Sequence, residues 1–462
     1  MLNDNTARTV IDHALSTGAD FAELFVEQNL TSNIEFSSGD IESIQAGIDF
    51  GIGIRLFFGE RILYGYTNRT DVDELQRITT ELVANQQQAA NNCTLGAFET
   101  QAYSDRHQSK APLAKIDDLD AKIEYARRVD RAARAENEKI SQVIARILQR
   151  QQNIILFNSE GLHVTDTRNY CRLQGIAVAT DGPLQSNGHH LPGALKGWEF
   201  SDEISPESIG KEAARIALVT LGAADCPSGE MPVVLGNGFG GVIFHEACGH
   251  LLETTSVAQK ASVFHDQLGE QIANPVVNAV DDGLMTGEWG SINIDDEGMQ
   301  TKRTQLIKDG RLESFLVDKM GAIKTGYERT GSGRRQSYRF APASRMRNTF
   351  IEPGDSSLDD MISSIDKGIY ARTMGGGSVT PGTGEFNFSI IEPYLIENGK
   401  VSRPLKSATL ISTGPDVLKR ISMVGNDFKL AAGMCGSVSG AVPTTVGQPA
   451  IKVDQILVGG QA

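Results

Sequence analysis

The sequence predicts an α+β protein, in which α/β regions with antiparallel sheets are followed by a mainly β region at the C-terminus. Three observations predict this fold class. In the first half of the chain, apolar residues at helical spacing alternate with runs of strand-forming residues. After Met231, glycine turns separate short apolar runs. A chain of 462 residues can also bury the cores of two or three domains.

The first predicted region spans residues 1–110 and opens on a helix. Apolar residues recur at helical spacing from Asn5 to Thr17, and the strand-like run Phe21–Asn29 follows. Alternating segments with turn residues between them then predict an antiparallel meander over residues 33–68. The region is completed by a helix, about Asp71 to Gln88, and by a linker, residues 91–112.

The second predicted region spans residues 111–222. A charged amphipathic helix, Leu119–Asn137, opens it, and a helix from Pro206 to Leu221 closes it. Between them, residues 141–180 predict strands that are broken at Asn158–Gly161. Three histidines in this region lack any ligand spacing, so we interpret them as structural: His163, His189 and His190.

The third predicted region, residues 223–462, is mainly β. Besides a helix described below, it has one helical piece, near Ser357 to Lys367. The predicted strands lie in residues 231–236, 291–295, 303–318, 386–401 and 455–460. Lys308-Asp309-Gly310 and Asn398-Gly399 predict tight turns within this set.

The charge balance excludes some classes of partner. Forty-three basic and fifty-eight acidic side chains give a formal net charge of -15, which argues against general binding to nucleic acid or to anionic lipid. The first residues lack the apolar run of a secretory signal, and eighteen consecutive apolar residues occur nowhere. We therefore expect a cytoplasmic protein without a membrane partner. Its five scattered cysteines are expected to be free thiols.

The segment Phe244–Glu253 carries the clearest chemistry. His245 and His250 are residue types that bind Zn²⁺, and Glu246 can take a proton from metal-activated water. In this His-Glu-x-x-x-His motif the histidines stand five residues apart, about 140° around a regular helix, so they cannot face one ion without distortion. We expect a π-type turn or a break at Gly249.

Two histidines do not complete a catalytic zinc site, which has three protein ligands and one open position. The residues alone leave the third ligand open. Cys435 is favoured by its adjacent glycines, which would let a loop bring the thiolate to the metal, although a buried inert thiol is an equal alternative. The full set of candidates is Glu253, Glu270, Cys226, Cys248 and Cys435.

A second pattern, Gly236–Gly241, matches GxGxxG between a strand and the motif helix. A dinucleotide-binding fold would need a second strand that ends in an acidic residue about twenty residues later, and none is convincing before Asp266. We therefore expect these glycines to allow close backbone approach at the helix entry.

The chain resembles the TldD/TldE (PmbA) metallopeptidase family over nearly its whole length. The matching stretches are His13–Glu27, Phe244–Glu253, Asp295–Gly298, Gly333–Ile351, Thr380–Phe388 and Gly433–Gly436. The resemblance implies that His245, His250 and Cys435 bind zinc and that Glu246 is the general base. It also implies the catalytic type of subunit, which forms a homodimer or a heterodimer with a TldE/PmbA-type subunit around the active site.

The sequence and the resemblance together predict a zinc-dependent peptidase that hydrolyses small or unfolded peptides. The alternative is a peptide-binding regulatory protein with a structural zinc site, which would have four protein ligands. The peptide is expected to bind by strand addition. Six residues are the richest supply of donors for an oxyanion: Arg334, Arg335, Tyr338, Arg339, Arg345 and Arg347. The alternative is that the arginines bind carboxylates across a dimer interface or lie in solvent.

Overall fold

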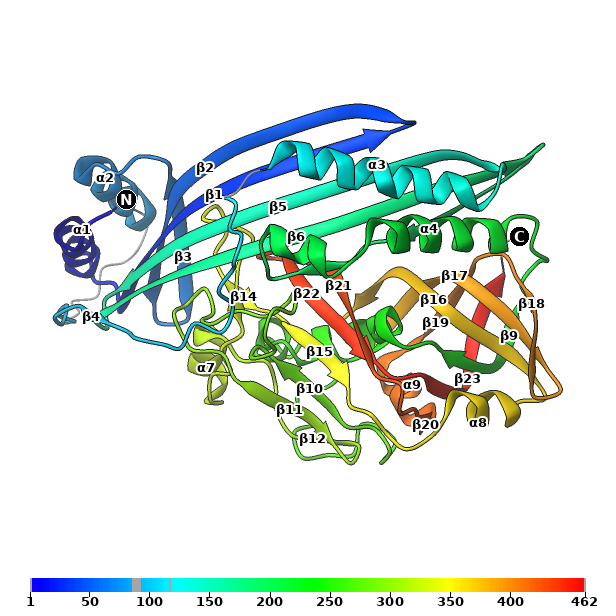
Figure 1. Cartoon of the computed structure of the whole chain (residues 1–462). Coiled ribbons are helices and arrows are strands. Elements are labelled where there is room, and N and C mark those ends of the chain that lie inside the picture. Colours follow the sequence, from blue (N-terminus) through cyan, green and yellow to red (C-terminus); the bar gives the residue numbers. More distant parts are fainter. Residues whose placement is uncertain (1, 85–92, 116–117, 461–462) are drawn as a thin grey trace.

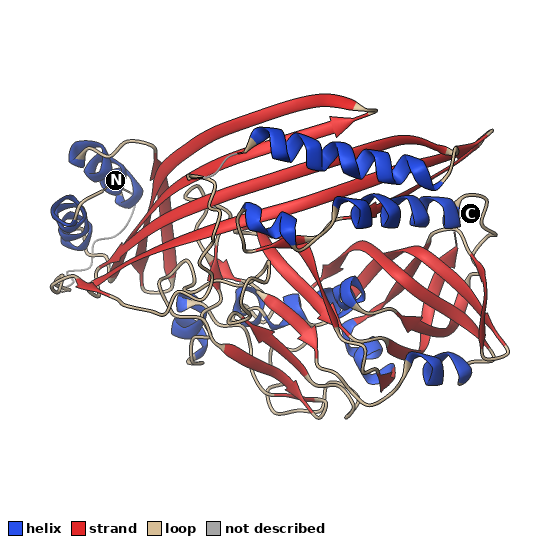
Figure 2. Cartoon of the chain, in the orientation of Figure 1, coloured by secondary structure: helices blue, strands red, loops and turns tan. Residues whose placement is uncertain are grey.

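The fold is α+β, as the sequence predicts. The computed structural model describes residues 2–84, 93–115 and 118–460. In these residues, helices cover sheets that are mostly antiparallel (Figures 1 and 2). None of the helices within the described ranges combines the length and the apolar character needed to cross a membrane.

The N-terminal half is organised around one long sheet with the strand order β3-β2-β1-β5-β6-β4, and β7 and β8 also pair with β6. Because β1 pairs with β5 from Glu23 to Ser37, this sheet runs through both predicted N-terminal regions. The predicted division at residues 110 and 222 stays a prediction. The elements are α1 (Asp4–Ser16), β1 (Phe21–Ser37), β2 (Asp40–Phe58), β3 (Arg61–Thr67), α2 (Val72–Val83), β4 (Glu99–Thr100), α3 (Leu119–Glu136), β5 (Ile140–Asn158), β6 (Leu162–Asp181), β7 (Leu184–His190), β8 (Gly193–Ala194) and α4 (Pro206–Thr220).

Side-chain caps fix the starts of these helices. The side chains of Asn3, Asp71, Asp118 and Ser205 each accept a hydrogen bond from a backbone N–H in the first turn that follows. The predicted helices are therefore found within one or two residues of their expected starts. Residues 85–88 of the predicted second helix, and residues 91–92 of the predicted linker, lie outside the described residues.

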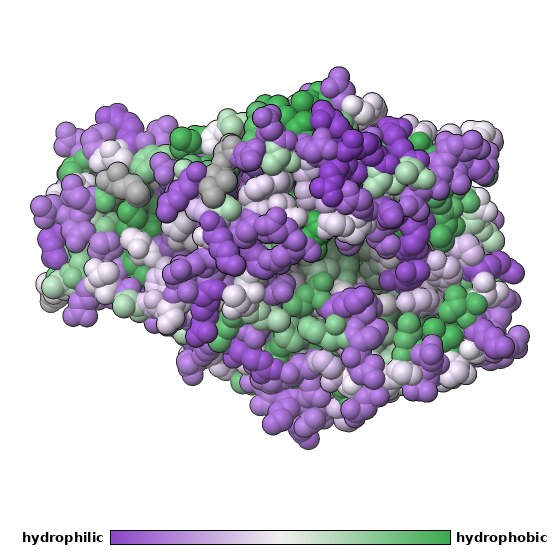
Figure 3. All heavy atoms as spheres, in the orientation of Figure 1, coloured by the Kyte–Doolittle hydropathy of each residue, from purple (hydrophilic) through white to green (hydrophobic). Residues whose placement is uncertain are grey.

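Helices α3 and α4 lie along one face of the long sheet, and α1 and α2 lie at the left end of this sheet in Figure 1, near β3. The face in Figure 3 is mostly hydrophilic along α3 and α4, and apolar residues gather below them, where the surface is hollowed. The C-terminal half faces this hollow.

Two larger sheets build the C-terminal half. One has the order β12-β11-β10-β15-β22-β21, and the other, β16-β9-β23-β19-β17-β18, closes on itself because β16 also pairs with β17. The elements are β9 (Gly229–Leu235), α5 (Val242–Ala247), α6 (Thr254–Val257), β10 (Ala279–Asp282), β11 (Arg303–Lys308), β12 (Arg311–Leu312), α7 (Lys319–Thr325), β13 (Gly333–Arg334), β14 (Ala343–Ser344), β15 (Asn348–Ile351), α8 (Leu358–Ser363), β16 (Lys367–Thr380), β17 (Glu385–Glu397), β18 (Lys400–Pro404), β19 (Ala408–Thr413), α9 (Gly414–Arg420), β20 (Ile421–Val424), β21 (Lys429–Ser437), β22 (Gly440–Gln448) and β23 (Ile451–Gly460).

One predicted strand of this half is wrong, and another ends earlier than predicted. Residues 291–295 form an irregular segment, because the Asp295 side chain accepts hydrogen bonds from the N–H groups of Glu297 and Met299 and closes a turn. Residues 313–318 leave the β11–β12 hairpin, and Leu316 bonds instead to the backbone of Leu252 and Thr254. These two hydrogen bonds hold in place the end of the predicted metal motif and the chain that follows it.

Helix α5 lies inside the largest apolar core of the described chain. Val242, Ile243, Phe244, Ala247 and Leu251 are all buried in it. Burial of this kind stabilises each large side chain by about 1.5–3 kcal/mol relative to exposure. The segment that carries the predicted metal ligands is therefore held on its apolar side by packing, and its polar side chains face inward to one site.

Candidate metal centre

The motif helix is broken, but not as expected. Helix α5 ends at Ala247, Cys248 takes a non-helical conformation (φ -136°, ψ -54°), and Gly249–Leu252 form a 3-10 turn. The expected π-type turn is wrong, and the break falls at Cys248, one residue before Gly249. A Cβ on Gly249 would lie 2.1 Å from the sulfur of Met346, so the turn packs where only glycine fits.

This break brings the two histidines to one side. The rings of His245 and His250 lie 4.9 Å apart between centroids and are nearly perpendicular, at 85°. Cys435 reaches them from β21, with its Sγ 3.1 Å from His245 Nε2 and 3.2 Å from His250 Nε2. All three residues are buried, and their potential ligand atoms lie within 4.8 Å of one another.

The three donors suit a metal ion. Zinc binds sulfur and nitrogen at about 2.0–2.3 Å, so donors about 3–4 Å apart can share one ion. Burial alone would raise the pKa of the Cys435 thiol, but the imidazoles of His245 and His250 hold it well below its usual value. The thiolate is the form that binds metal. Two imidazoles and a thiolate are the chemistry of a site for a borderline cation such as zinc.

Glu246 stands beside the three donors. One carboxylate oxygen lies 3.9 Å from His250 Nε2, and the side chain is 15% exposed. Burial raises the pKa of this carboxyl, and the two imidazoles oppose the shift. With His245, Glu246 lines a cavity of about 100 Å³ that also touches Gly376 and Gly433. The carboxylate is thus open to a small molecule at the candidate metal position.

Two further residues, Glu253 and Arg345, contact the candidate metal ligands. Glu253 accepts a hydrogen bond from His250 Nδ1 at 3.1 Å, which leaves His250 Nε2 directed at the thiol. Arg345 lies 3.8 Å from the other Glu253 oxygen and donates to the carbonyl of Cys435. It also donates to Ser439 Oγ at 2.9 Å. Arg345 therefore ties the β21–β22 turn to the histidine segment, a role that its sequence context did not indicate.

The other candidate ligands lie elsewhere. Cys248 and Cys226 are buried in the apolar core, and burial raises the pKa of both thiols. Glu270 is exposed on a loop. His163, His189 and His190 are not part of the metal-binding group found in the described residues.

The arginines of residues 334–347 are engaged within the protein. Arg334, Arg335, Arg345 and Arg347 are buried, and each donates hydrogen bonds to protein groups. Arg339 pairs with Asp49 at the surface at 2.7 Å. These contacts within the chain are a structural role that the sequence did not predict for the four buried arginines.

The glycines of residues 236–241 allow the close backbone approach that the sequence predicts. A Cβ on Gly241 would lie 2.5 Å from the backbone of Gly447 on β22. Strand β9 pairs with β16 in parallel and with β23 in antiparallel, and the glycines lead through a short turn into α5. They place His245 against the sheet that carries Cys435.

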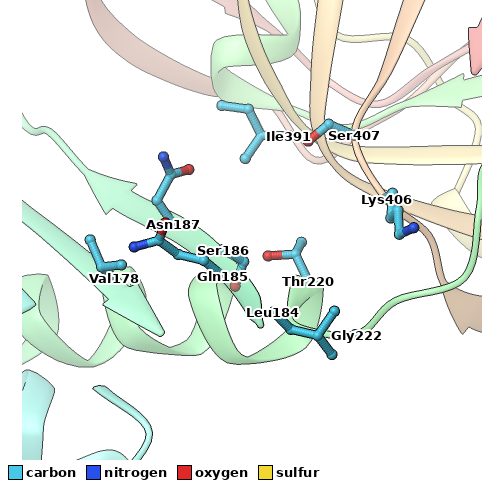
Figure 4. A pocket seen from close by; sticks show the side chains of 10 residues that line it. All are labelled: Val178, Leu184, Gln185, Ser186, Asn187, Thr220, Gly222, Ile391, Lys406 and Ser407. Atoms are coloured by element: carbon cyan, nitrogen blue, oxygen red, sulfur yellow. The ribbon is translucent and has the colours of Figure 1, made fainter. Parts of the chain in front are cut away.

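A larger cavity lies away from these donors. It measures about 490 Å³ and lies between β7, the end of α4 and the loop before β19 (Figure 4). Its one charged lining residue is Lys406, which pairs with Asp225 at 2.7 Å. Its lining contains none of the residue types of the metal centre.

Comparisons with known proteins show the family to which the chain is related. Three family models match the chain: PmbA/TldA metallopeptidase domain 1 over residues 22–85, the central domain over residues 114–221 and the C-terminal domain over residues 228–460. A metalloprotease TldD homolog of Haemophilus influenzae is 36% identical over 99% of this chain and 97% of its own length. A zinc metalloprotease TldD homolog of Saccharolobus solfataricus is 25% identical over 97% of this chain and 99% of its own.

Solved structures share the fold at low sequence identity. A Thermotoga maritima protein described as a candidate modulator of a DNA gyrase has a TM-score of 0.80 at 20% identity, with 99% of this chain and 100% of that chain covered. TldE from Thermococcus kodakarensis has a TM-score of 0.77 at 18% identity, with 98% and 100% covered. These likenesses extend over the whole chain.

Proposed function

The chain belongs to the PmbA/TldA metallopeptidase family, and from this premise we propose that it is a zinc-dependent peptidase that hydrolyses small or unfolded peptides. One observation carries the proposal. The two imidazoles and the thiol converge within 4.8 Å, and a carboxylate, Glu246, stands beside them in the same cavity. In this proposal His245, His250 and Cys435 are the metal ligands, and Glu246 is the general base.

Each residue has a distinct task in the proposed reaction. A bound zinc ion supplies a Lewis acid that polarises a carbonyl and lowers the pKa of coordinated water to about 7. Glu246 accepts the proton of the attacking water and passes it to the leaving amine, a role for which a raised carboxyl pKa is suited. Glu253 holds the tautomer of His250, since it accepts the hydrogen bond from Nδ1. Arg345 fixes the backbone of Cys435.

The peptide is proposed to bind by strand addition along β21. This strand is the last of its sheet and pairs with β22 alone among the described strands. Cys435 lies on this strand, and Gly433 and Met434 line the cavity beside Glu246. Backbone pairing tolerates many side chains, which suits unfolded peptides. Strongly different rates across a random peptide library would argue against this mode.

The decisive experiment is Glu246→Gln. The variant should keep its zinc, measured by mass spectrometry of the metal content, and should lose cleavage of casein-derived peptides by about 10²–10⁴-fold. Exposed Glu270→Gln is the matched control and should retain both. Unchanged cleavage by Glu246→Gln would sink the proposal.

Two further assays separate the alternatives. Chelation should abolish cleavage, whereas a regulatory protein with a structural zinc site would show no cleavage to abolish. We also propose a homodimer or a heterodimer with a TldE/PmbA-type subunit, and a cytoplasmic location. Cleavage should therefore be measured with and without such a subunit, and the mass of the assembly by light scattering.

A further inference from the structure

A second cavity continues the one at the metal centre. It measures about 370 Å³ and lies between the β7–β8 segment of the long sheet and the strands β16 and β21. The two cavities share Phe239, Gly433 and Met434 in their walls. A chain that leaves Glu246 along β21 therefore enters this larger cleft.

Arg172 is a wall of the cleft and makes no ion pair in the described part of the chain. Its Nη2 donates one long hydrogen bond, 3.4 Å, to the carbonyl of Ala432, and its guanidinium lies 5.5 Å from the centre of the Trp289 ring. Its Nε is buried and has no hydrogen-bond partner. The guanidinium is held in place by a ring and a carbonyl, and most of its donors are unused.

This state differs from that of four other buried arginines, whereas buried Arg334 resembles Arg172 in that it donates to a carbonyl and makes no ion pair in the described residues. Arg55, Arg168, Arg335 and Arg347 each meet a carboxylate at 2.5–2.9 Å. Burial alone shifts the pKa of Arg172, downward, so no protein carboxylate compensates its charge. A partly desolvated guanidinium without an anion is costly, and a carboxylate that fills its planar fork removes the cost.

The position of Arg172 sets a distance. Ala432, which it contacts, is three residues from Cys435 along β21. At about 3.3 Å per residue, the guanidinium lies about 10 Å along the strand from the candidate metal ligand. A peptide paired with β21 would bring its third residue from the reacting bond to Arg172.

We propose that Arg172 is a specificity-determining residue, which binds a carboxylate of the peptide about three residues from the bond that is cleaved. This inference rests on the proposed function. The carboxylate is either the C-terminus of the peptide or an Asp or Glu side chain. Glu288 also lines this cleft, disfavours a second negative charge there and so helps to fix where the carboxylate binds.

Binding tests the proposal without turnover. A fluorescent peptide with a free C-terminus is compared with its amidated form and with a series of amidated peptides, each of which carries a glutamate at one position. Each is titrated against zinc-loaded Glu246→Gln protein by fluorescence anisotropy. A peptide whose carboxylate reaches Arg172 should bind about 10–100-fold more tightly than the amidated one. Which peptide gains identifies the source of the carboxylate.

Substitutions of Arg172 in the same background test its role. Arg172→Gln should bind all peptides equally, and Arg172→Lys should keep part of the preference because it retains the charge but not the fork. Arg172→Glu should favour a peptide with lysine at that position. Arg146→Gln, whose arginine pairs with Glu35 on the same sheet, is the matched control and should keep the full preference.

The possible failures are distinguishable. Equal binding of all peptides before Arg172 is changed, or a full carboxylate preference in Arg172→Gln, overturns the inference. Fragments cut by the protein with Glu246 intact, mapped by mass spectrometry, should end about three residues from the carboxylate, and cleavage at random distances also overturns it. Absence of any metal-dependent cleavage overturns the proposed function instead, while the binding result stands.

Discussion

Two of the buried clusters of charged or ionisable groups in this molecule are completed in different ways. At the contact of the long sheet with the C-terminal half, Arg55 bridges Glu23 at 2.5 Å and Glu297 at 2.6 Å, and Arg335 also pairs with Glu23. At the candidate metal centre, the potential ligand atoms of two imidazoles and a thiol lie within 4.8 Å of one another.

The difference distinguishes a structural ionic cluster from a candidate metal-binding site. In the first cluster each guanidinium has at least one carboxylate partner, although Arg55 Nε and Arg335 Nε are themselves buried without a hydrogen-bond partner. In the second cluster His245 Nδ1 is buried without a hydrogen-bond partner, and three potential ligand atoms converge on one point. Two imidazoles and a thiol this close together suit one shared ion. The comparison predicts that the first cluster controls stability and the second controls metal binding.

The largest effect is expected from Cys435→Ser. If a zinc site contributes about 10–16 kcal/mol and three ligands share it equally, the loss of one weakens zinc binding by about 10³-fold. Competition with a chelating dye would measure the affinity. Cys248→Ala is the matched control, because this second buried thiol lies in the apolar core. Equal zinc affinity in the two variants would remove Cys435 from the ligand set.

The other cluster is tested by Arg55→Met. Removal of one partner leaves Glu23 and Glu297 buried with less compensation, which should lower the free energy of unfolding by about 3–5 kcal/mol. Urea denaturation followed by circular dichroism would measure it. Arg77→Met is the control, since Arg77 pairs with Glu74 and Glu81 on an exposed helix face and should change stability little. Equal losses in both variants would contradict the comparison.

A smaller effect on the metal centre is expected from Glu253→Gln. The amide no longer attracts the Nδ1 proton of His250 as a carboxylate does, so zinc affinity should fall by about 10–100-fold. The same dye competition applies, with Glu270→Gln as the unaffected control. If Glu253→Gln bound zinc as tightly as the parent protein, the hydrogen bond to His250 would have no part in tuning the site.

Sequence patterns predicted the N-terminal half well because its helices and strands are periodic and begin at side-chain caps such as Asp71 and Ser205. They failed where long-range contacts decide the backbone. The run 291–295 alternates like a strand, yet Asp295 turns it. The two-turn helix α9 escaped prediction because Gly414–Arg420 is too short to show a period.

The candidate site was predicted in part, for similar reasons. The unusual spacing of His245 and His250 indicated a distorted helix. Its exact place depends on Met346, about a hundred residues away, which packs on Gly249. Residue patterns alone left the third ligand open, because only the pairing of β21 with β22 places Cys435 beside the histidines. No sequence pattern singled out Arg172, because only the structure shows that it makes no ion pair within the described residues.

The smallest effect concerns a carboxylate at the margin of the ionic cluster, Asp318. It accepts hydrogen bonds from Thr254 Oγ1 and the N–H of Gly321, but it makes no ion pair within the described residues. Burial, and then the charge of Glu297, raise its pKa to about 6 from 3.8. The native state thus holds the proton more tightly than the unfolded chain, so the free energy of unfolding falls as pH rises from about 4 to about 6, and stays lowered above.

Asp318→Asn has no proton to lose and keeps an oxygen for the N–H of Gly321. Relative to the parent protein, it should gain about 1–3 kcal/mol of stability between pH 4 and pH 7, measured by urea denaturation across that range. Asp360→Asn should shift the other way, because a hydrogen bond from Ser357 lowers the pKa of this exposed carboxyl and its ionised form stabilises the native state. If the free energy of unfolding changed with pH in parallel for the parent protein and Asp318→Asn, the charge of this carboxylate would be compensated in the native state. The ionic cluster would then neutralise Asp318 as well as it neutralises the carboxylates that pair with Arg55.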